Sequence, residues 1–266
     1  SQDLILQSRK RISLALAGSQ SGKTILGPVW LMNEMIARGP GDYLVVAPTF
    51  PLMYPKCLPA VLALFGKRGL GLGHFKGSPA KQFDFTKEGE RKLFGSEQSE
   101  KTTIYFGHAQ DPDSLESATA KAAWLDEAGQ EKFRAPSWEA INARVSIHKG
   151  RILITTTPYV WNWLKLRIYD PWDKERKAGR DHPLIDVVQF DSTTNPAFDR
   201  EEFERHRLSM PLWKFNMRYR GRFERPAGLI YDCFDYDKHC CPPFEIPRYW
   251  PRFGGLDFGG LHTAGV

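Results

Sequence analysis

The chain has 266 residues, of which 41% are hydrophobic and 26% charged, and its formal net charge at pH 7 is +6. This composition is typical of a folded globular protein with one large domain, alone or with smaller pieces. No apolar run approaches the roughly 18 residues that span a bilayer, and the first eleven residues lack the layout of a secretion signal. We therefore expect an intracellular protein without membrane contact, and the positive charge favours a polyanionic partner.

Strand-like and helical patterns alternate along the first 195 residues and predict an α/β protein with a mostly parallel sheet. The predicted strands are 12–17, 42–48, 81–86, 102–107, 122–128, 151–158 and 186–190. The predicted helices are 23–37, 53–65 after its prolines, and 137–146 with Ser137 as the N-cap residue. Apart from the short strand at 81–86, residues 66–101 are expected to form loops or a hairpin.

The character of the sequence changes after residue 195. Residues 199–223 are basic with a helical pattern, residues 226–251 hold several prolines, and "RFGGLDFGG" (252–260) has the pattern of a new strand. We therefore predict four parts. They are a core at 1–195, a small helical lid at 196–225, a linker at 226–251 and the start of another domain at 252–266.

The four cysteines are Cys57, Cys233, Cys240 and Cys241, and no pair has C-x-x-C spacing. The segment "DKHCC" (237–241) holds residue types that bind zinc, but no second ligand pair accompanies it. The spacing favours reduced, structural thiols over a zinc site.

The segment "AGSQSGKT" (17–24) joins a predicted buried strand to a predicted helix. In a phosphate-binding loop of this kind, backbone N–H groups and the helix N-terminus surround the phosphates. Gly22 permits close backbone approach, Lys23 reaches the terminal phosphates and the Thr24 hydroxyl binds Mg²⁺. Ala17 stands where the pattern has glycine, which is tolerable if its dihedral angles are not left-handed. The other candidate phosphate contacts are Ser19, Gln20 and Ser21.

A second chemical signal is "AAWLDEA" (122–128), an apolar strand that ends in Asp126 and Glu127. One carboxylate there can hold Mg²⁺ and the other can deprotonate the attacking water. Burying two acids costs free energy unless they have such a role, so Glu127 argues for hydrolysis rather than nucleotide storage. "TTTP" (155–158) ends a further strand, and its hydroxyls are candidate sensors of the γ-phosphate.

The order of these segments resembles the large terminase subunit of tailed bacteriophages, a family of motors that pump DNA into a preformed capsid. The resemblance is carried by "AGSQSGKT", "VVAPTF" (45–50), "WLDEAG" (124–129), "GRILITTTPY" (150–159) and a late "GGLDFGG". It implies a P-loop NTPase of the ASCE type that uses ATP and Mg²⁺.

The resemblance also assigns roles to individual residues. Gln2 matches the glutamine beside the adenine, and Lys23 and Thr24 match the phosphate-loop pair. Asp126 matches the Mg²⁺ carboxylate and Glu127 the catalytic one, while Thr156 and Thr157 match the coupling motif. Asp257 matches the first metal-binding aspartate of the family's RNase-H-like nuclease, which uses Mg²⁺ or Mn²⁺.

Two departures from the family pattern stand out. Many members carry an arginine inside the phosphate loop, where this chain has Ser19 and Gln20. Our candidate for the missing charge is Arg144, acting as an arginine finger on a neighbouring subunit, with a plain surface arginine as the alternative. Only a dozen or so residues follow the linker, so Asp257 is not expected to form a complete nuclease site here. The full-length parent is expected to cut DNA.

The resulting hypothesis is an ATP-hydrolysing motor that translocates double-stranded DNA into a viral procapsid. Its expected partners are DNA, the portal protein, the small terminase subunit and further copies in a ring, although an isolated chain is expected to be a monomer. It is expected in the cytoplasm of the infected bacterium and transiently on the procapsid. In the lid, Arg218, Arg220 and Arg222 are candidates for phosphate contacts with ATP or DNA. The alternatives are a helicase with two RecA-like domains, and a scaffold that binds ATP with little turnover.

Overall fold

The computed structural model describes residues 2–110, 112, 119–225, 239–242, 244–251, 254, 256–258 and 263–265. The chain divides into two compact units, residues 1–226 and residues 227–266.

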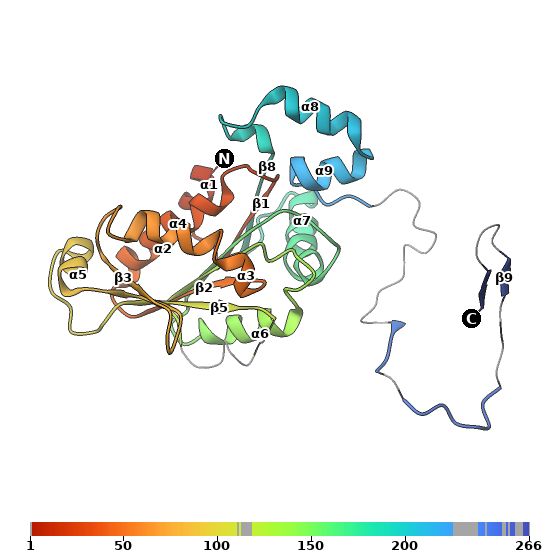
Figure 1. Cartoon of the computed structure of the whole chain (residues 1–266), viewed down its shortest axis with the longest axis horizontal. Helices are drawn as coiled ribbons and strands as arrows, with labels where there is room; N and C mark the ends of the chain where they lie inside the picture. Colours follow the sequence, from red (N-terminus) through yellow and green to blue (C-terminus); the bar gives the residue numbers. More distant parts are fainter. Residues whose placement is uncertain are drawn as a thin grey trace. The chain divides into compact units, whose positions relative to one another are not determined.

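An eight-stranded sheet forms the centre of the first unit (Figure 1). In sheet order its strands are β3 (Gly73–Lys76), β4 (Gln82–Phe85), β5 (Thr103–His108), β2 (Asp42–Ala47), β6 (Ala122–Asp126), β7 (Arg151–Thr156), β1 (Ile12–Ala17) and β8 (Ile185–Phe190). The six strands from β5 to β8 are parallel, whereas β4 runs antiparallel to both β3 and β5. This order confirms the predicted α/β fold with a mostly parallel sheet.

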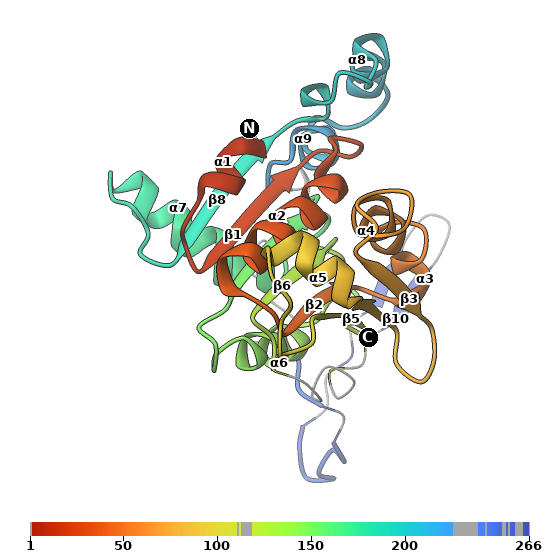
Figure 2. The same ribbon diagram turned by 90° about the vertical axis from the view of Figure 1, so that its left-hand side faces the viewer.

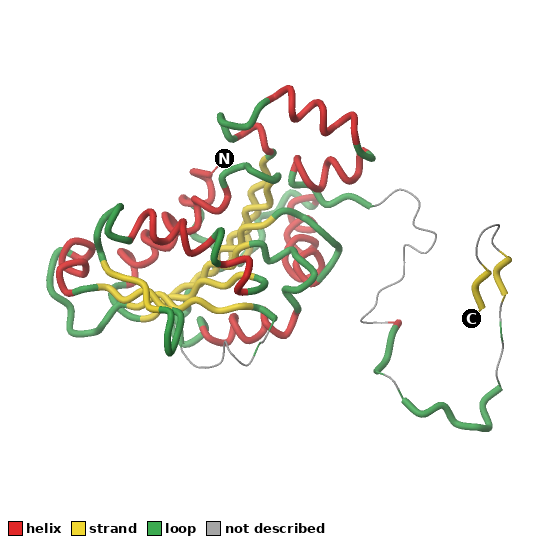
Figure 3. The backbone as a smooth tube through the Cα atoms, in the orientation of Figure 1, coloured by secondary structure: helices red, strands yellow, loops and turns green. Residues whose placement is uncertain are grey.

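Helices cover both faces of this sheet (Figures 2 and 3). One face packs against α1 (Gln2–Gln7), α2 (Lys23–Arg38), α4 (Cys57–Phe65) and α5 (Lys87–Phe94). The other face packs against α6 (Ala135–Arg144), a π-helix (Lys165–Tyr169) and α7 (Asp170–Lys177). A short α3 (Phe50–Met53) follows β2. The strands alternate between these two cores, as β1 shows: Ala15 and Ala17 face α2, and Leu14 and Leu16 face away from it.

A 3₁₀ turn (Ser192–Thr194) comes just before the predicted lid at 196–225, which contains the helices α8 (Arg200–Ser209) and α9 (Leu212–Arg220). An aromatic cluster holds the two helices together: the rings of Phe203 and Phe215 lie 4.9 Å apart, and Tyr219 stacks on Phe215 at 5.6 Å. The boundaries of core and lid stay predictions.

Three local predictions differ from the structure. The predicted strand 122–128 ends at Asp126, because Glu127 takes a left-handed backbone conformation with φ of 54°. The predicted cap Ser137 lies inside α6, where Arg134 is the N-cap residue and the buried Ser137 hydroxyl donates to the carbonyl of Ala109 at 2.5 Å. Residues 87–94 form α5 rather than a loop, with the Thr86 hydroxyl accepting from the backbone N–H of Gly89.

The second unit contains an antiparallel pair, β9 (Leu256–Phe258) and β10 (Thr263–Gly265). Asp257 lies in β9 opposite Ala264. Within the described part of the chain, no helix is long and apolar enough to cross a membrane.

Candidate nucleotide site

The phosphate loop connects β1 to α2 at the carboxyl edge of the parallel strands. Gln20 and Gly22 both have positive φ, 59° and 85°, which turns the loop so that α2 begins directly at Lys23. The first backbone N–H groups of a helix have no partner inside it, and the helix dipole there favours negative charge. The loop and the start of α2 therefore have the backbone geometry that suits an anion.

Backbone groups of the phosphate loop contact α9 in the predicted lid and residues 192–195 just before it. The N–H of Ser19 donates to the carbonyl of Arg218 in α9 at 2.7 Å, and Asn195 donates to the carbonyl of Gln20 at 2.7 Å. The hydroxyl of Ser192 donates to the carbonyl of Ser19 at 2.6 Å. Because the Ser19 N–H is directed at the carbonyl of Arg218 in α9, it is not available to a phosphate in this arrangement.

The two acids after β6 lie beside the phosphate-loop lysine. The Nζ atom of Lys23 is 3.4 Å from Oε1 of Glu127, and both side chains are buried. The absence of a side chain at Gly27 allows α2 to pack this closely on β6, because a Cβ there would overlap the ring of Trp124. The predicted lysine and acids thus converge on one place.

Asp126 is held by hydrogen bonds from two sides. The Thr155 hydroxyl donates to Oδ1 at 2.7 Å, and that hydroxyl accepts from Trp124 Nε1 at 2.8 Å. The Cys57 thiol faces Oδ2 at 3.5 Å. Burial, together with the charge of Glu127, raises the pKa of Asp126 to about 6. A nearby cation would favour the ionised form of this carboxylate.

Glu127 has three donors around one carboxylate. Lys56 and Lys23 both contact Oε1, and Lys56 is the closer at 3.0 Å. The Tyr159 hydroxyl donates to Oε2 at 2.9 Å. Burial alone would raise the pKa of Glu127, but the charges of the two lysines outweigh it and bring the pKa below its ordinary value. Glu127 is therefore ionised at neutral pH.

These residues fit a nucleotide with its magnesium ion. The hydroxyl of Ser21 is buried in the phosphate loop and makes no hydrogen bond within the described part of the chain. Among the described residues, no cationic group forms an ion pair with the buried Asp126, and the Thr24 hydroxyl lies in the first turn of α2, directly after Lys23. A hydroxyl and a carboxylate are oxygen ligands of the kind that Mg²⁺ takes alongside phosphates.

The other predicted site residues lie at varying distances from this centre. Gln2 is beside it, since its amide donates to the carbonyl of Ser21 at 3.3 Å. Thr156 is buried and its hydroxyl is committed locally, accepting from the N–H of Gly129 and donating to the carbonyl of Thr157 at 2.9 Å each. The side chain of Asp257 and the whole of Cys233 lie outside the described residues.

Arg144 lies at the opposite edge of the sheet. It is the last residue of α6, and its carbonyl accepts from the N–H of Ala120 just before β6 begins. The next carbonyl, of Val145, accepts from Arg11 just before β1 begins. The amino ends of the strands, and not the carboxyl ends that carry the phosphate loop, therefore surround Arg144. Its role as an arginine finger stays a prediction that requires a neighbouring subunit.

Sequence reasoning missed four contributors to the site: Lys56, Cys57, Thr155 as the partner of Asp126, and Tyr159. Thr155 had a signal in the sequence, because it belongs to the motif "TTTP" at the end of β7, and Tyr159 directly follows that motif. Lys56 and Cys57 had none, because they reach the acids only when the start of α4 is placed against the end of β6.

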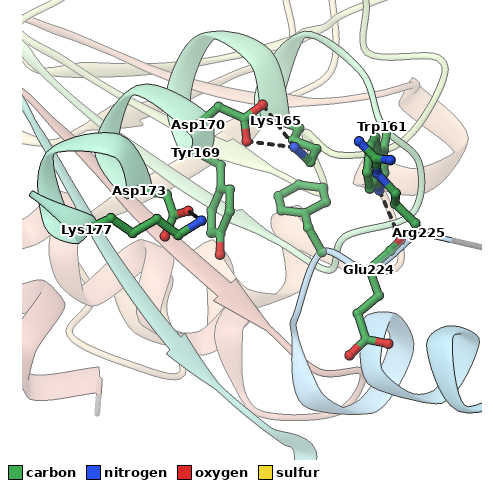
Figure 4. Close-up of a pocket in the computed structure, with 9 residues that line it drawn as sticks. Trp161, Lys165, Tyr169, Asp170, Asp173, Lys177, Glu224 and Arg225 are labelled. Atoms are coloured by element: carbon green, nitrogen blue, oxygen red, sulfur yellow. Dashed lines mark hydrogen bonds and ion pairs between the residues drawn. The ribbon is translucent and has the colours of Figure 1, made fainter. Parts of the chain in front are cut away.

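A separate hollow of about 450 Å³ lies between the π-helix, α7 and residues 223–225 (Figure 4). Four of its charged groups form two ion pairs: Lys165 lies 2.6 Å from Asp170, and Lys177 lies 2.6 Å from Asp173. Trp161 borders it and donates from Nε1 to the carbonyl of Glu224 at 3.0 Å. This hollow is not part of the nucleotide site.

Residues 14–237 match the family model described as terminase large subunit, T4likevirus-type, N-terminal. The chain belongs to this family. It is 25% identical over 252 residues to the terminase large subunits of Thermus virus P23-45 and Thermus phage G20c. Each alignment covers 87% of this chain and 50% of the relative, so this terminase chain spans about half the length of these curated relatives.

Solved terminase structures show the same fold. The ATPase domain of the Thermus phage P74-26 large terminase matches with a TM-score of 0.63 and 22% identity, covering 84% of this chain and 92% of that one. The large terminase of a thermophilic bacteriophage matches with a TM-score of 0.66 and 17% identity, covering 99% of this chain and 63% of that one. The large terminase of bacteriophage HK97 matches with a TM-score of 0.57 and 14% identity, covering 82% of this chain and 48% of that one. These matches confirm the P-loop NTPase fold.

Proposed function

We propose that this terminase chain hydrolyses ATP and that the protein containing it uses the energy to translocate double-stranded DNA into a procapsid. The observation that carries the proposal is the 3.4 Å approach of Lys23 to Glu127 at the end of β6. It joins a phosphate-binding lysine to a buried, ionised base. The large terminase of the thermophilic bacteriophage has been solved in complex with ADP and with ATP-γ-S, which supports nucleotide binding by this fold.

The residues divide the work of hydrolysis between them. The N–H groups of residues 21–24 and the Lys23 ammonium bind the phosphates and stabilise the negative charge that develops during cleavage. Thr24 and Asp126 would hold Mg²⁺, which supplies further charge neutralisation when bound. Glu127 orients the attacking water and accepts its proton. The Tyr159 hydroxyl holds the second oxygen of Glu127 and fixes the direction of the first.

The geometry also supports a route from the site to the lid. The end of β7 contacts Asp126 through Thr155, and the segment after it contacts Glu127 through Tyr159. Two residues further on, Trp161 donates to the carbonyl of Glu224, which follows α9. Since α9 also binds the phosphate loop through the carbonyl of Arg218, a change at the phosphates reaches the lid from two directions. We propose that this linkage converts ATP turnover into movement.

The remaining parts of the proposal concern the whole protein. DNA, the portal protein, the small terminase subunit and further copies in a ring are its proposed partners, and the host cytoplasm and procapsid its proposed location. The full-length protein is proposed to cut DNA with Mg²⁺ or Mn²⁺ through a nuclease domain that begins near Asp257. Membership of the terminase family favours packaging over the helicase alternative.

The experiment replaces the proposed base. Glu127→Gln is expected to retain ATP binding, because Lys23 and the loop are unchanged, and to lower turnover by about 10²- to 10⁴-fold. The control is Glu131→Gln, an exposed acid four residues further along the chain. Phosphate release is measured on the assembled motor, and binding with a fluorescent ATP analogue. Turnover at the parent rate in Glu127→Gln would show that the base is misassigned, and negligible turnover in the parent would favour the scaffold alternative.

A further inference from the structure

The residue that precedes α4 breaks a local rule of helix design. Lys56 is the N-cap residue of α4, yet its side chain makes no capping hydrogen bond. Serine, threonine, aspartate and asparagine are preferred at this position, and a positive charge there opposes the helix dipole. Residues that depart from such local sequence preferences are found most often where the side chain contributes to a functional site.

The side chain of Lys56 extends instead to Glu127, whose Oε1 lies 3.0 Å from its Nζ. The next residue, Cys57, faces the other acid, with Sγ 3.5 Å from Oδ2 of Asp126. Two consecutive residues at the start of α4 thus contact both carboxylates after β6. The Lys56 side chain is 38% exposed and the Glu127 side chain 3%, so the ammonium group lies over an almost fully buried anion.

The charges around Glu127 indicate the condition under which its pairing with Lys56 is most important. A buried carboxylate is costly unless it is paired, and the described contacts of Glu127 are two cations and one neutral donor. One of the cations, Lys23, is the only charged residue of the segment 17–24 and is required by the phosphates. While Lys23 serves the phosphates, Lys56 is the cation that remains for Glu127 among the described residues, because the Tyr159 hydroxyl carries no charge.

We propose that Lys56 is a positioning residue that holds Glu127 in its working orientation while Lys23 is engaged with the nucleotide. The inference rests on the proposed ATPase function and adds a component to its site. It assigns the start of α4, together with the end of β6, to the hydrolytic site.

A kinetic test uses the full-length protein that contains this chain. Lys56→Met is expected to lower kcat by about 10- to 100-fold, because a misplaced catalytic group loses rate steeply with displacement. The KM for ATP is expected to change by less than about threefold, because the phosphate contacts are retained. Lys56→Arg restores most of kcat, since arginine supplies a cation of similar reach. The control is Lys67→Met, an exposed lysine just after α4, which is expected to behave as the parent.

A second test measures thermal stability and does not depend on ATP hydrolysis. Thermal unfolding midpoints without nucleotide are compared in the parent, Lys56→Met, Glu127→Gln and the double variant. Lys56→Met is expected to lower the midpoint in the parent background and to have little effect in the Glu127→Gln background, because its partner is then uncharged. Equal effects in both backgrounds would contradict the contact.

The outcomes distinguish a failure of the positioning role of Lys56 from a failure of the proposed ATPase function. Unchanged or increased kcat in Lys56→Met, or an effect on KM alone, would overturn the positioning role. So would a loss that Lys56→Arg does not restore while the protein remains folded. If the parent shows no hydrolysis, the proposed function fails, and the inference built on it is overturned with it, even where the unfolding cycle confirms the Lys56–Glu127 contact.

Discussion

Replacing Gly18 with alanine tests whether α9 packs directly on the phosphate loop. Gly18 is not in the left-handed region, so alanine meets no backbone restriction there. Its Cβ would, however, overlap the carbonyl oxygen of Tyr219 in α9 and lie 2.6 Å from the hydroxyl of Ser192. Ordinary carbon–oxygen contacts are longer, so α9 or the loop must move.

The expected cost follows from what that movement disturbs. Overpacking a tight contact costs about 1–3 kcal/mol. The same shift strains the hydrogen bonds from Ser19 to Arg218 and from Ser192 to Ser19, each worth about 0.5–1.5 kcal/mol. We therefore expect Gly18→Ala to lower the free energy of unfolding by about 3 kcal/mol, or roughly 6–12 °C in Tm for a unit of this size.

The measurement is thermal and urea unfolding, with binding of a fluorescent ATP analogue as a second readout. Gly77→Ala is the matched control, because its Cβ would meet only Phe75, at 3.8 Å, among the described residues. The control should unfold like the parent. ATP affinity should fall in Gly18→Ala, since the displaced loop carries the phosphate contacts. Parent-like stability and affinity in Gly18→Ala would refute the packing of α9 on the loop.

Three further predictions concern other parts of the first unit. Thr155→Val removes the hydroxyl between Trp124 and Asp126 and should cost about 2–4 kcal/mol of unfolding free energy in urea titrations, because two buried polar groups lose a partner. Burial raises the pKa of Asp84, but hydrogen bonds from two lysines and a glutamine bring it down to about 2. A carboxyl whose pKa is lower in the folded state stabilises the fold at pH values above its unfolded pKa, which is near 3.8. About 1–2 kcal/mol of unfolding free energy should therefore be lost between pH 4 and 2. The variant Asp84→Asn should be less stable than the parent at pH 7 and should not show that loss. Arg144→Ala should lower ATP turnover only in the assembled ring and leave the isolated chain unchanged, and an equal loss in both would place the arginine in its own subunit's chemistry.

Local patterns predicted the parts of the fold that depend on short-range physics. The buried strand at 12–17, the loop after it and the helix from Lys23 each follow from apolar runs and glycine, and the structure confirms them. Helix α5 was missed because "KEGERKLF" has few apolar residues, although Thr86 was available as a cap signal. Ser137 was mistaken for a cap because a buried hydroxyl bound to a distant carbonyl has no local signature.

The candidate site likewise contains residues that local patterns predict and residues that depend on long-range packing. Lys23 and Glu127 were predictable because parallel strands end at one edge of a sheet, which brings the loop after β1 close to the residues after β6. The contacts of Lys56 and Cys57 depend on the path of the chain between β2 and α4, which no spacing in the sequence encodes. The distant position of Arg144 likewise follows from where α6 ends against the strands.

The most direct test of the account is a crystal structure of the protein with a non-hydrolysable ATP analogue and Mg²⁺. The account predicts the γ-phosphate between the Nζ of Lys23 and the carboxylate of Glu127, with the metal bound by Thr24 and facing Asp126. A triphosphate bound elsewhere, with Glu127 remote from its terminal phosphorus, would contradict it.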